Sequence, residues 1–260
     1  MNPWISRSIE YANRESYLDD LFAVYPTIPE GSRDIDVSVW NEVVKAYKAK
    51  NHRELVKSLL KLDLFPVKDS YVAHMRRDVS SLDKNPETLR RLCNRLYEMG
   101  LEKLREKASE PKETNRQIGP FFRAWLRKGE LGAPLLNQVE LKKTRGDAIL
   151  DAGDAELKEF ARRELNYNRD KGLDFIARFG GKYVIGEAKF LTDFGGHQNA
   201  QLSDALSTLA TPGVKAIKIA VLDGVVYIKG KNKMYKQITE DYSKENIMSA
   251  LVLKDFLRSI

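Results

Sequence analysis

The sequence contains a single cysteine, Cys93, and three histidines among its 260 residues. One cysteine excludes an intramolecular disulfide and a cysteine-based zinc cluster within one chain. The histidines are too scattered for a histidine-rich zinc site. No apolar run approaches the roughly 18 residues that cross a bilayer, and the first residues lack the apolar core of a signal peptide. These absences lead us to expect a cytoplasmic protein without membrane contact.

Neither sign of charge dominates the composition. Lys and Arg number 44 against 37 Asp and Glu, which gives a formal net charge of +7. Hydrophobic residues make up 42% and charged residues 31% of the chain, a composition that excludes a collagen, a disordered tail and a disulfide scaffold. The small positive excess is compatible with a polyanionic partner but does not identify one.

The first half of the chain has the apolar spacing of helices. Apolar residues recur at intervals of three and four, which predicts helices within residues 17–26, 39–50, 52–65 and 87–108. Gly129, Gly132 and Pro134 then interrupt the pattern. We expect a helical N-terminal region at residues 1–135 and a second region at residues 136–260.

The second half alternates helices with strands. The dipeptides Gly180-Gly181 and Asp223-Gly224 are typical of two-residue hairpin turns between strands. The expected fold class is therefore α/β (α+β), with a mixed central sheet flanked by helices. The expected helices are 153–166, 199–210 and 244–260, and the expected strands are 173–179, 182–190, 215–222 and 225–229.

The hairpin at Gly180-Gly181 fixes which side chains oppose one another. Counting back from a two-residue loop places Asp174 directly opposite Glu187, and the alternation of strand side chains places Lys189 on the same face. Opposed residues have Cβ atoms about 4.5–5.5 Å apart, and like charges at that separation destabilise a sheet. A solvated strand face is the simpler explanation of Glu and Lys, but the flanking residues are apolar or small.

A divalent cation would remove the repulsion between the two carboxylates. Mg²⁺ prefers oxygen ligands and usually takes one or two carboxylates, with water and phosphate completing its shell. The ammonium of Lys189 reaches the same place, where it can orient or deprotonate a water, or neutralise charge on phosphorus. Asp174, Glu187, Lys189 and a metal ion together suit metal-assisted phosphodiester hydrolysis.

The segment LDFIARFGGKYVIGEAKF resembles the core of the PD-(D/E)XK nuclease superfamily. Asp174 matches the first acid of its motif, Glu187 the second and Lys189 the lysine, whereas Leu173 replaces the motif's proline. Within that superfamily the chain looks most like a type II restriction endonuclease. The resemblance implies a prokaryotic, intracellular homodimer that needs Mg²⁺, or Mn²⁺ in its place, and hydrolyses double-stranded DNA to leave 5′-phosphates. It also implies the Ala188 carbonyl as a metal ligand and 136–260 as the catalytic core, with 1–135 embracing DNA or forming the dimer.

A third acid is a further candidate ligand. In the helix before the hairpin, Leu157, Phe160, Ala161 and Glu164 follow the helical spacing that puts them on one inward stripe. Related nucleases often use a helix glutamate at the metal site. The alternative is a Glu at the helix end that pairs with a nearby arginine.

Two kinds of segment are candidates for contact with DNA. The loop GGHQN and the helix after it carry amides that can pair with adenine, and KETNRQ carries Arg116, the best candidate for a guanine contact. Basic clusters would hold phosphates, although each alone is more often a solvated surface. The predicted DNA-binding residues are His197, Gln198, Asn199, Gln201, Asn115, Arg116, Lys142, Lys143, Arg145, Lys231 and Lys233.

Three other functions remain open at this point. The same fold serves structure-selective repair nucleases and junction resolvases. A DNA-binding protein without catalysis is a second alternative, although Asp174, Glu187 and Lys189 form an intact set. A pair of sugar-cleaving acids is the third, but Lys189 would have no role there.

Overall fold

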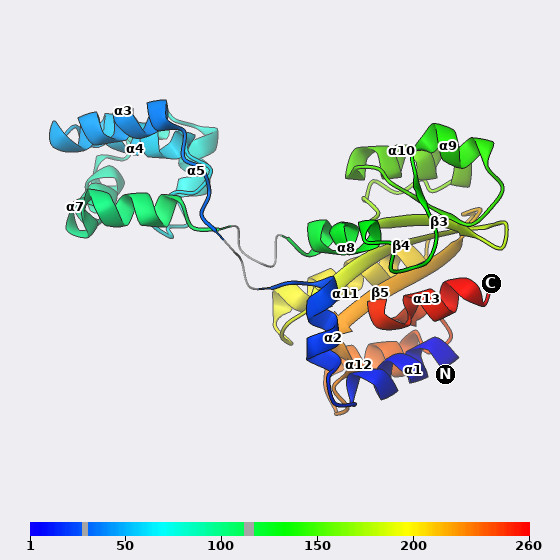
Figure 1. Ribbon diagram of the computed structural model, residues 1–260. Coiled ribbons are helices and arrows are strands. Elements are labelled where there is room, and N and C mark those ends of the chain that lie inside the picture. The colour runs from blue at the N-terminus through cyan, green and yellow to red at the C-terminus, as the bar shows by residue number, and fades with distance from the viewer. Residues whose placement is uncertain (28–30, 112–116) are drawn as a thin grey trace. The chain divides into compact units, whose positions relative to one another are not determined.

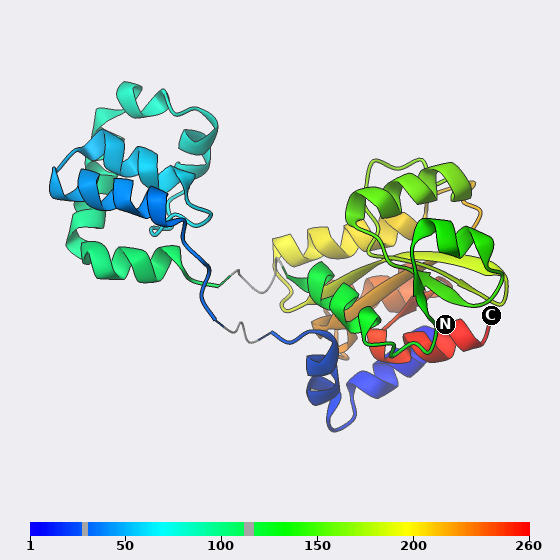
Figure 2. The same ribbon diagram turned by 45° about the horizontal axis from the view of Figure 1, so that its top comes forward.

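The computed structural model describes residues 1–27, 31–111 and 117–260. The chain forms two compact units: residues 29–113, called the helical unit below, and residues 1–28 with 114–260, called the sheet unit. The helical unit has its own hydrophobic core, and Figure 2 shows α3 and α4 side by side within it. Its helices are α3 (Val37–Lys48), α4 (His52–Lys61), α5 (Val72–Arg77), α6 (Ser81–Lys84) and α7 (Pro86–Ala108).

The sheet unit contains a six-stranded mixed sheet within the described residues, in the order β1-β2-β3-β4-β5-β6. Strand β3 is antiparallel to both of its neighbours, whereas the β1–β2, β4–β5 and β5–β6 pairs are parallel. The predicted mixed α/β fold is therefore confirmed. The strands are β1 (Leu135–Leu136), β2 (Ala148–Leu150), β3 (Phe175–Phe179), β4 (Lys182–Leu191), β5 (Ile217–Gly224) and β6 (Ile247–Met248).

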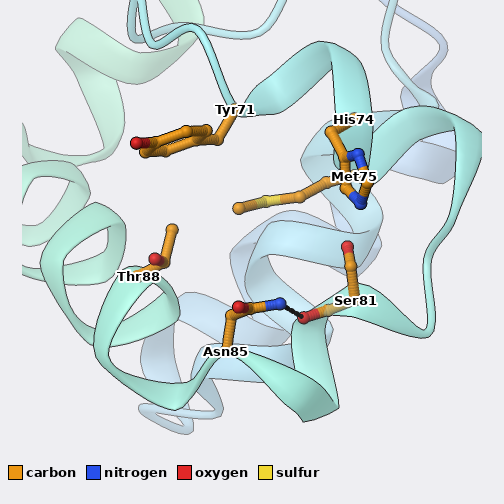
Figure 3. Close-up of a pocket in the computed structure, with 6 residues that line it drawn as sticks. All are labelled: Tyr71, His74, Met75, Ser81, Asn85 and Thr88. Carbon is orange, nitrogen blue, oxygen red and sulfur yellow. Dashed lines mark hydrogen bonds between the residues drawn. The ribbon is translucent and has the colours of Figure 1, made fainter.

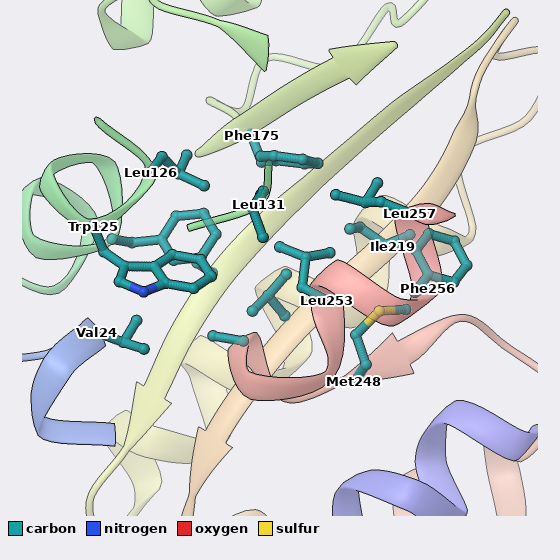
Figure 4. Close-up of a cluster of buried hydrophobic side chains, with 14 of the residues drawn as sticks. Val24, Trp125, Leu126, Leu131, Phe175, Ile219, Met248, Leu253, Phe256 and Leu257 are labelled. Atoms are coloured by element: carbon teal, nitrogen blue, oxygen red, sulfur yellow. The ribbon is translucent and has the colours of Figure 1, made fainter. Parts of the chain in front are cut away.

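Helices cover both faces of this sheet, and Figure 1 shows the strands lying between α10 and α13. One face packs against α2, α8 and α13 (Figure 4). The other face packs against α10 towards β2 and β3, and against α11 towards β4 and β5. The helices of the sheet unit are α1 (Pro3–Ala12), α2 (Tyr17–Val24), α8 (Ile118–Arg127), α9 (Gln138–Lys143), α10 (Asp154–Leu165), α11 (Gly196–Leu209), α12 (Lys233–Lys236) and α13 (Ala250–Arg258).

The observed division of the chain differs from the boundary expected near residue 135. Residues 1–28 and 114–135 belong with the sheet rather than with the helical unit. The physical reason is burial: Val24 of α2 and Phe122 of α8 are almost fully buried in the core that covers one face of the sheet. The helical unit is thus an insertion between two helices of the sheet unit.

The hairpin between β3 and β4 forms as the sequence predicts. Gly180 and Gly181 both have positive φ angles, +53° and +78°, which a two-residue turn of this twist requires. Phe179 pairs with Lys182, and the ladder continues to the pair of Phe175 and Gly186. The predicted register is confirmed over this stretch.

The second predicted hairpin, at Asp223-Gly224, is wrong. Strand β5 continues through both residues and stays parallel to β4, and a 3₁₀ turn at Val225–Tyr227 follows in place of a strand. Asp223 is fully buried, whereas a turn residue would lie in water. Its carboxylate accepts hydrogen bonds from the Tyr25 hydroxyl at 3.1 Å, from the Ser249 hydroxyl, and from the Ala250 N–H at 3.2 Å.

The carboxyl of Asp223 thereby ties α2 and the start of α13 to the end of β5. Burial raises its pKa to about 7, although hydrogen bonds from Ser249, Ala250 and Tyr25 act in the opposite direction. In the unfolded chain the same group releases its proton near pH 3.9. Between these two values the folded state binds more protons than the unfolded state, so the stability of the sheet unit falls as the pH rises.

We predict that Asp223→Asn makes this pH dependence shallower. One such carboxyl contributes a slope of up to about 1.4 kcal/mol per pH unit between its unfolded and folded pKa values, and asparagine does not titrate. Denaturant unfolding followed from pH 4.5 to 7.5 would measure the slope. An identical slope in the variant and the wild type would show that Asp223 is ionised throughout.

Candidate functional site

Asp174 lies immediately before β3 and crosses towards the neighbouring strand. Its N–H donates to the Gly186 carbonyl at 3.1 Å, and its carboxylate accepts the Ala188 N–H at 3.0 Å. The regular pairing of β3 with β4 ends at Phe175 and Gly186. The sequence register predicts that Asp174 continues this pairing directly opposite Glu187, and the structure does not show that pair. Its carboxylate instead accepts a hydrogen bond from the N–H of Ala188, the residue after Glu187. This bond fixes the carboxylate beside β4.

The structure brings together the three side chains singled out from the sequence. The ammonium nitrogen of Lys189 lies 3.0 Å from Oε2 of Glu187 and 3.5 Å from Oδ2 of Asp174. The Glu187 side chain is 6% exposed, while those of Asp174 and Lys189 are 18% and 23% exposed. The group is thus open to solvent from one side, with Glu187 at its base.

The two carboxylates control the charge of Lys189. Burial by itself lowers the pKa of this lysine, but the attraction of Asp174 and Glu187, together with hydrogen bonds to both, outweighs it. The pKa of Lys189 therefore lies above its ordinary value, and the side chain is a cation in this arrangement. Two carboxylates that meet at one place are also the oxygen ligands that a hard divalent cation prefers in proteins.

Glu187 is held from the opposite side by α11. The Thr208 hydroxyl, which is fully buried, donates to Oε1 of Glu187 at 2.7 Å. The hydroxyl oxygens of Tyr167 and Thr208 lie 3.5 Å apart. Since Thr208 gives its proton to the carboxylate, Tyr167 is the donor in that second bond. Sequence reasoning missed Thr208, because nothing in the helical pattern of 199–210 marks one buried hydroxyl as a partner for a strand residue.

A second cation approaches Asp174 from α8. A guanidinium nitrogen of Arg123 lies 3.9 Å from Oδ1 of Asp174, and the same nitrogen forms an ion pair with Asp154 at the start of α10. One turn earlier, a Cβ placed on Gly119 would lie only 3.1 Å from the same Asp174 oxygen. Helix α8 therefore borders the site closely. Nothing in the local sequence pattern indicates that this helix approaches Asp174.

The oxygen atoms of this group suit a hard divalent cation. Carboxylates of Asp174 and Glu187 point to one place, and the Ala188 carbonyl is the third oxygen proposed for it. Among the described residues, no group of three or more His, Cys, Asp or Glu side chains is arranged to hold a metal ion. The site thus offers two carboxylates, with the remaining positions left to backbone, water and substrate.

Glu164 does not join this group. It is exposed, and it forms an ion pair with Lys142 of α9 at 2.6 Å. The expectation that Glu164 lies on the inward stripe of its helix is wrong, because Leu165 occupies the buried position instead. The outcome matches the alternative of a helix-end glutamate with a basic partner, although that partner is a lysine.

The polar segment after β4 divides into buried and exposed side chains. Gln198 is buried, with its amide bonded to the backbone N–H and the hydroxyl of Thr192 at 3.3 and 3.2 Å. The Asn199 amide nitrogen donates to the Phe194 carbonyl at 3.1 Å. These two amides shape the loop. His197 is exposed and Gln201 is half-buried, and nitrogen atoms of the two side chains lie 3.0 Å apart, so both remain candidates for DNA contact.

The predicted phosphate contacts lie on three segments. Lys143, Arg145, Lys231 and Lys233 are exposed, whereas Lys142 is paired with Glu164 as described above. The loop 141–146 is held by the buried guanidinium of Arg178, which donates to the Leu141 carbonyl at 2.9 Å and to Gly146 and Thr144. Asn115 and Arg116 lie outside the described residues.

The helical unit has hollows of its own. One pocket of about 420 Å³ is drawn in Figure 3, and a neighbouring one of about 550 Å³ shares Thr88 with it. The first pocket is lined by Tyr71, His74, Met75, Ser81, Asn85 and Thr88, and the second by Glu87, Thr88, Arg90, Arg91, Asn94, Arg95 and Glu98.

Among the described residues, no helix has the length and apolar character needed to cross a membrane.

Comparison with known protein families gives a match that spans almost the whole chain. The family model described as Tsp45I type II restriction enzyme covers residues 2–260, and so includes both units. No curated protein and no solved structure matches the chain significantly.

We predict that Thr208→Val lowers the melting temperature more than Thr211→Val does. Valine leaves the Glu187 oxygen buried without its donor, which costs about 1–3 kcal/mol, or roughly 2–4 °C for each kcal/mol in a domain of this size. The matched control removes only a 3.3 Å bond from the Thr211 hydroxyl to the Ser207 carbonyl. Calorimetry of both variants at pH 7 measures the difference, and equal melting temperatures would contradict the assigned bond.

Proposed function

The chain belongs to the Tsp45I type II restriction enzyme family, and we propose that it is a Mg²⁺-dependent endonuclease that cuts double-stranded DNA at a specific sequence. The observation that carries the proposal is the meeting of Asp174, Glu187 and Lys189 where β3 begins beside β4, in the middle of a mixed sheet. Restriction enzymes act on intracellular DNA, so action in the cytoplasm is part of the proposal.

We assign the site to the PD-(D/E)XK type. Asp174 is the first acid, Glu187 the second and Lys189 the lysine, and the hairpin between β3 and β4 carries all three. The confirmed register from Phe179 to Phe175 supports this assignment, because it sets the place at which Asp174 meets β4. The α11 crossover between the parallel strands β4 and β5 supports it as well, since it supplies the hydroxyl that holds Glu187.

Asp174, Glu187 and the Ala188 carbonyl would hold Mg²⁺, with Mn²⁺ as a substitute. When bound, such a cation polarises the phosphate and lowers the pKa of a bound water. The protein's own contribution is positioning. Thr208 keeps Glu187 in one orientation, and the Ala188 N–H does the same for Asp174. The ammonium of Lys189 would orient the attacking water or donate to a phosphate oxygen. In-line attack would leave a 5′-phosphate and a 3′-hydroxyl.

A homodimer is part of the same proposal. One chain carries one set of Asp174, Glu187 and Lys189. Cutting both strands at one place is simplest with two sets related by a twofold axis, which also matches the symmetry of many DNA sites.

The helical unit is proposed to contact DNA. Helix α7 exposes Arg91, Asn94 and Arg95, side chain types that bind base edges and phosphates in the major groove, and these residues line the second pocket. Arg95 is paired with Glu98 at 3.2 Å, which holds its guanidinium out along the helix surface. The opposite side of α7 packs in the core of the helical unit through Leu92, Cys93 and Leu96.

We predict that Asp174→Asn and Glu187→Gln each slow DNA cleavage by roughly a thousandfold or more, because each removes a carboxylate from the metal site. Binding of the same DNA in EDTA should change little. The matched control is Glu164→Gln, an acid of the same sheet unit that is paired with Lys142 outside the site. Cleavage by either site variant at the wild-type rate would contradict the assignment, and loss of activity in the control would restore Glu164 as a ligand.

We predict that Arg95→Ala weakens binding to the preferred DNA sequence by about five- to hundredfold, the range for loss of one base contact. Arg105→Ala is the matched control, since Arg105 is an exposed arginine of the same helix beyond the break at Gly100. Fluorescence anisotropy in EDTA, with a duplex selected by the wild type from a random pool, measures both. Equal affinities of the two variants would contradict the role of the α7 surface.

A further inference from the structure

Arg123 lies beside Asp174 and was not among the site residues predicted from the sequence. Its guanidinium nitrogen lies 3.9 Å from Oδ1 of Asp174, on the side away from Lys189, which contacts Oδ2. The Arg123 side chain is 22% exposed, so it is neither in the core nor free in solvent. Asp154 pairs with the same guanidinium nitrogen and holds it in place.

The acids at this site suffice for one metal ion. Asp174 and Glu187 supply the only carboxylates around Lys189 within the described residues, where no larger cluster of metal ligands occurs. Asp154 is a third acid nearby, but its carboxylate already forms an ion pair with Arg123. Two carboxylates match the usual share of a protein in binding one Mg²⁺. A pair of metal ions that clamps the attacking and leaving oxygens would call for further oxygen ligands.

The formal charges of the site also favour one metal ion rather than two. Asp154, which is largely exposed, Asp174 and Glu187 are three acidic side chains, and Lys189 and Arg123 are two basic ones, so the formal net charge of the group is −1. One divalent cation changes this to one net positive charge, which a phosphodiester neutralises. A second divalent cation would leave two positive charges unbalanced in a partly buried site, where electrostatic interactions are stronger than in water.

We propose that Arg123 takes the role that a second metal ion has in two-metal nucleases, binding a non-bridging oxygen of the phosphate that is cut, beside a single divalent cation. This inference rests on the proposed function. A guanidinium suits that task, because its planar donors bind phosphate oxygens in pairs. Asp154 is then a positioning residue.

The reaction that Arg123 assists is a simple displacement on phosphorus. The water oxygen forms a bond to phosphorus as the bond to the 3′-oxygen breaks. The water gives up one proton to solvent, and the departing 3′-oxygen takes one from solvent. Negative charge grows on the non-bridging oxygens between these events, and a fixed cation there stabilises the transition state more than the ground state.

The first test counts metal ions. Mn²⁺ titrated into the full-length wild-type protein, followed by calorimetry, should bind once per chain at a site that Glu187→Gln removes. The single-turnover cleavage rate should depend on Mg²⁺ concentration with a Hill coefficient of one. Two Mn²⁺ ions per chain that both disappear in Glu187→Gln, or a Hill coefficient of two, would overturn the proposal.

The second test uses Arg123→Gln, with Arg127→Gln as its matched control. Arg127 lies one turn further along α8 and pairs with Asp151 at 2.8 Å, with its side chain 56% exposed. We expect Arg123→Gln to slow cleavage at saturating Mg²⁺ by roughly 10²–10³-fold, as for loss of one transition-state donor. Mn²⁺ should bind it as tightly as the wild type or more tightly, since a cation beside Asp174 has been removed. Arg123→Lys should recover part of the rate, and Asp154→Asn should lose less.

The outcomes separate this inference from the function on which it rests. If the wild type cuts DNA and Arg123→Gln cuts as fast as Arg127→Gln, the role of Arg123 is wrong and the nuclease proposal stands. Weaker Mn²⁺ binding in Arg123→Gln would likewise overturn the inference, because it would show a structural role in shaping the metal site. A wild type that cuts no DNA in Mg²⁺ would overturn both proposals.

Discussion

Two carboxylates held close together on neighbouring strands repel each other, and the arrangement around Asp174 and Glu187 follows from that constraint. Lys189 lies between them, and Arg123 approaches the outer oxygen of Asp174. Each carboxylate also accepts a hydrogen bond from the protein, from the Ala188 N–H in one case and from Thr208 in the other. Positive charge and directed donors together keep two like charges in a partly buried place.

The elements of the sheet unit each supply one part of this arrangement. The tight turn at Gly180-Gly181 sets the register that brings Asp174 to β4. Helix α11 covers the face on which Glu187 lies, and α8 approaches the same site at Gly119 and Arg123. The group is therefore built by contacts between segments far apart in the sequence. The inserted helical unit leaves these contacts intact, since α2 and α8 on either side of it both pack on the sheet.

The sequence was sufficient for those features that depend on neighbouring residues. Alternation and a two-glycine turn predict the hairpin, and hence the meeting of Asp174, Glu187 and Lys189. The local bend at Asp174 was not predictable, because it depends on a side-chain bond to Ala188. Burial of Asp223 and exposure of Glu164 went against the local pattern for the same reason: their partners, Tyr25 and Lys142, lie on other elements. The role of Arg123 was not predicted, because the spacing of apolar residues indicates only which face of α8 is buried. It does not indicate which other side chains the polar residues of α8 contact.

Membership of a restriction enzyme family and the Asp174–Glu187–Lys189 group point to one central claim, that this group cuts DNA with the help of a divalent cation at a specific sequence. The most direct measurement is a digest of fully sequenced plasmid and phage DNA by the wild-type protein in Mg²⁺, with every new end sequenced. The account predicts ends that share one short sequence and carry 5′-phosphates, and no cutting in EDTA. Cutting that continues in EDTA, or ends found only at branches and nicks, would contradict it.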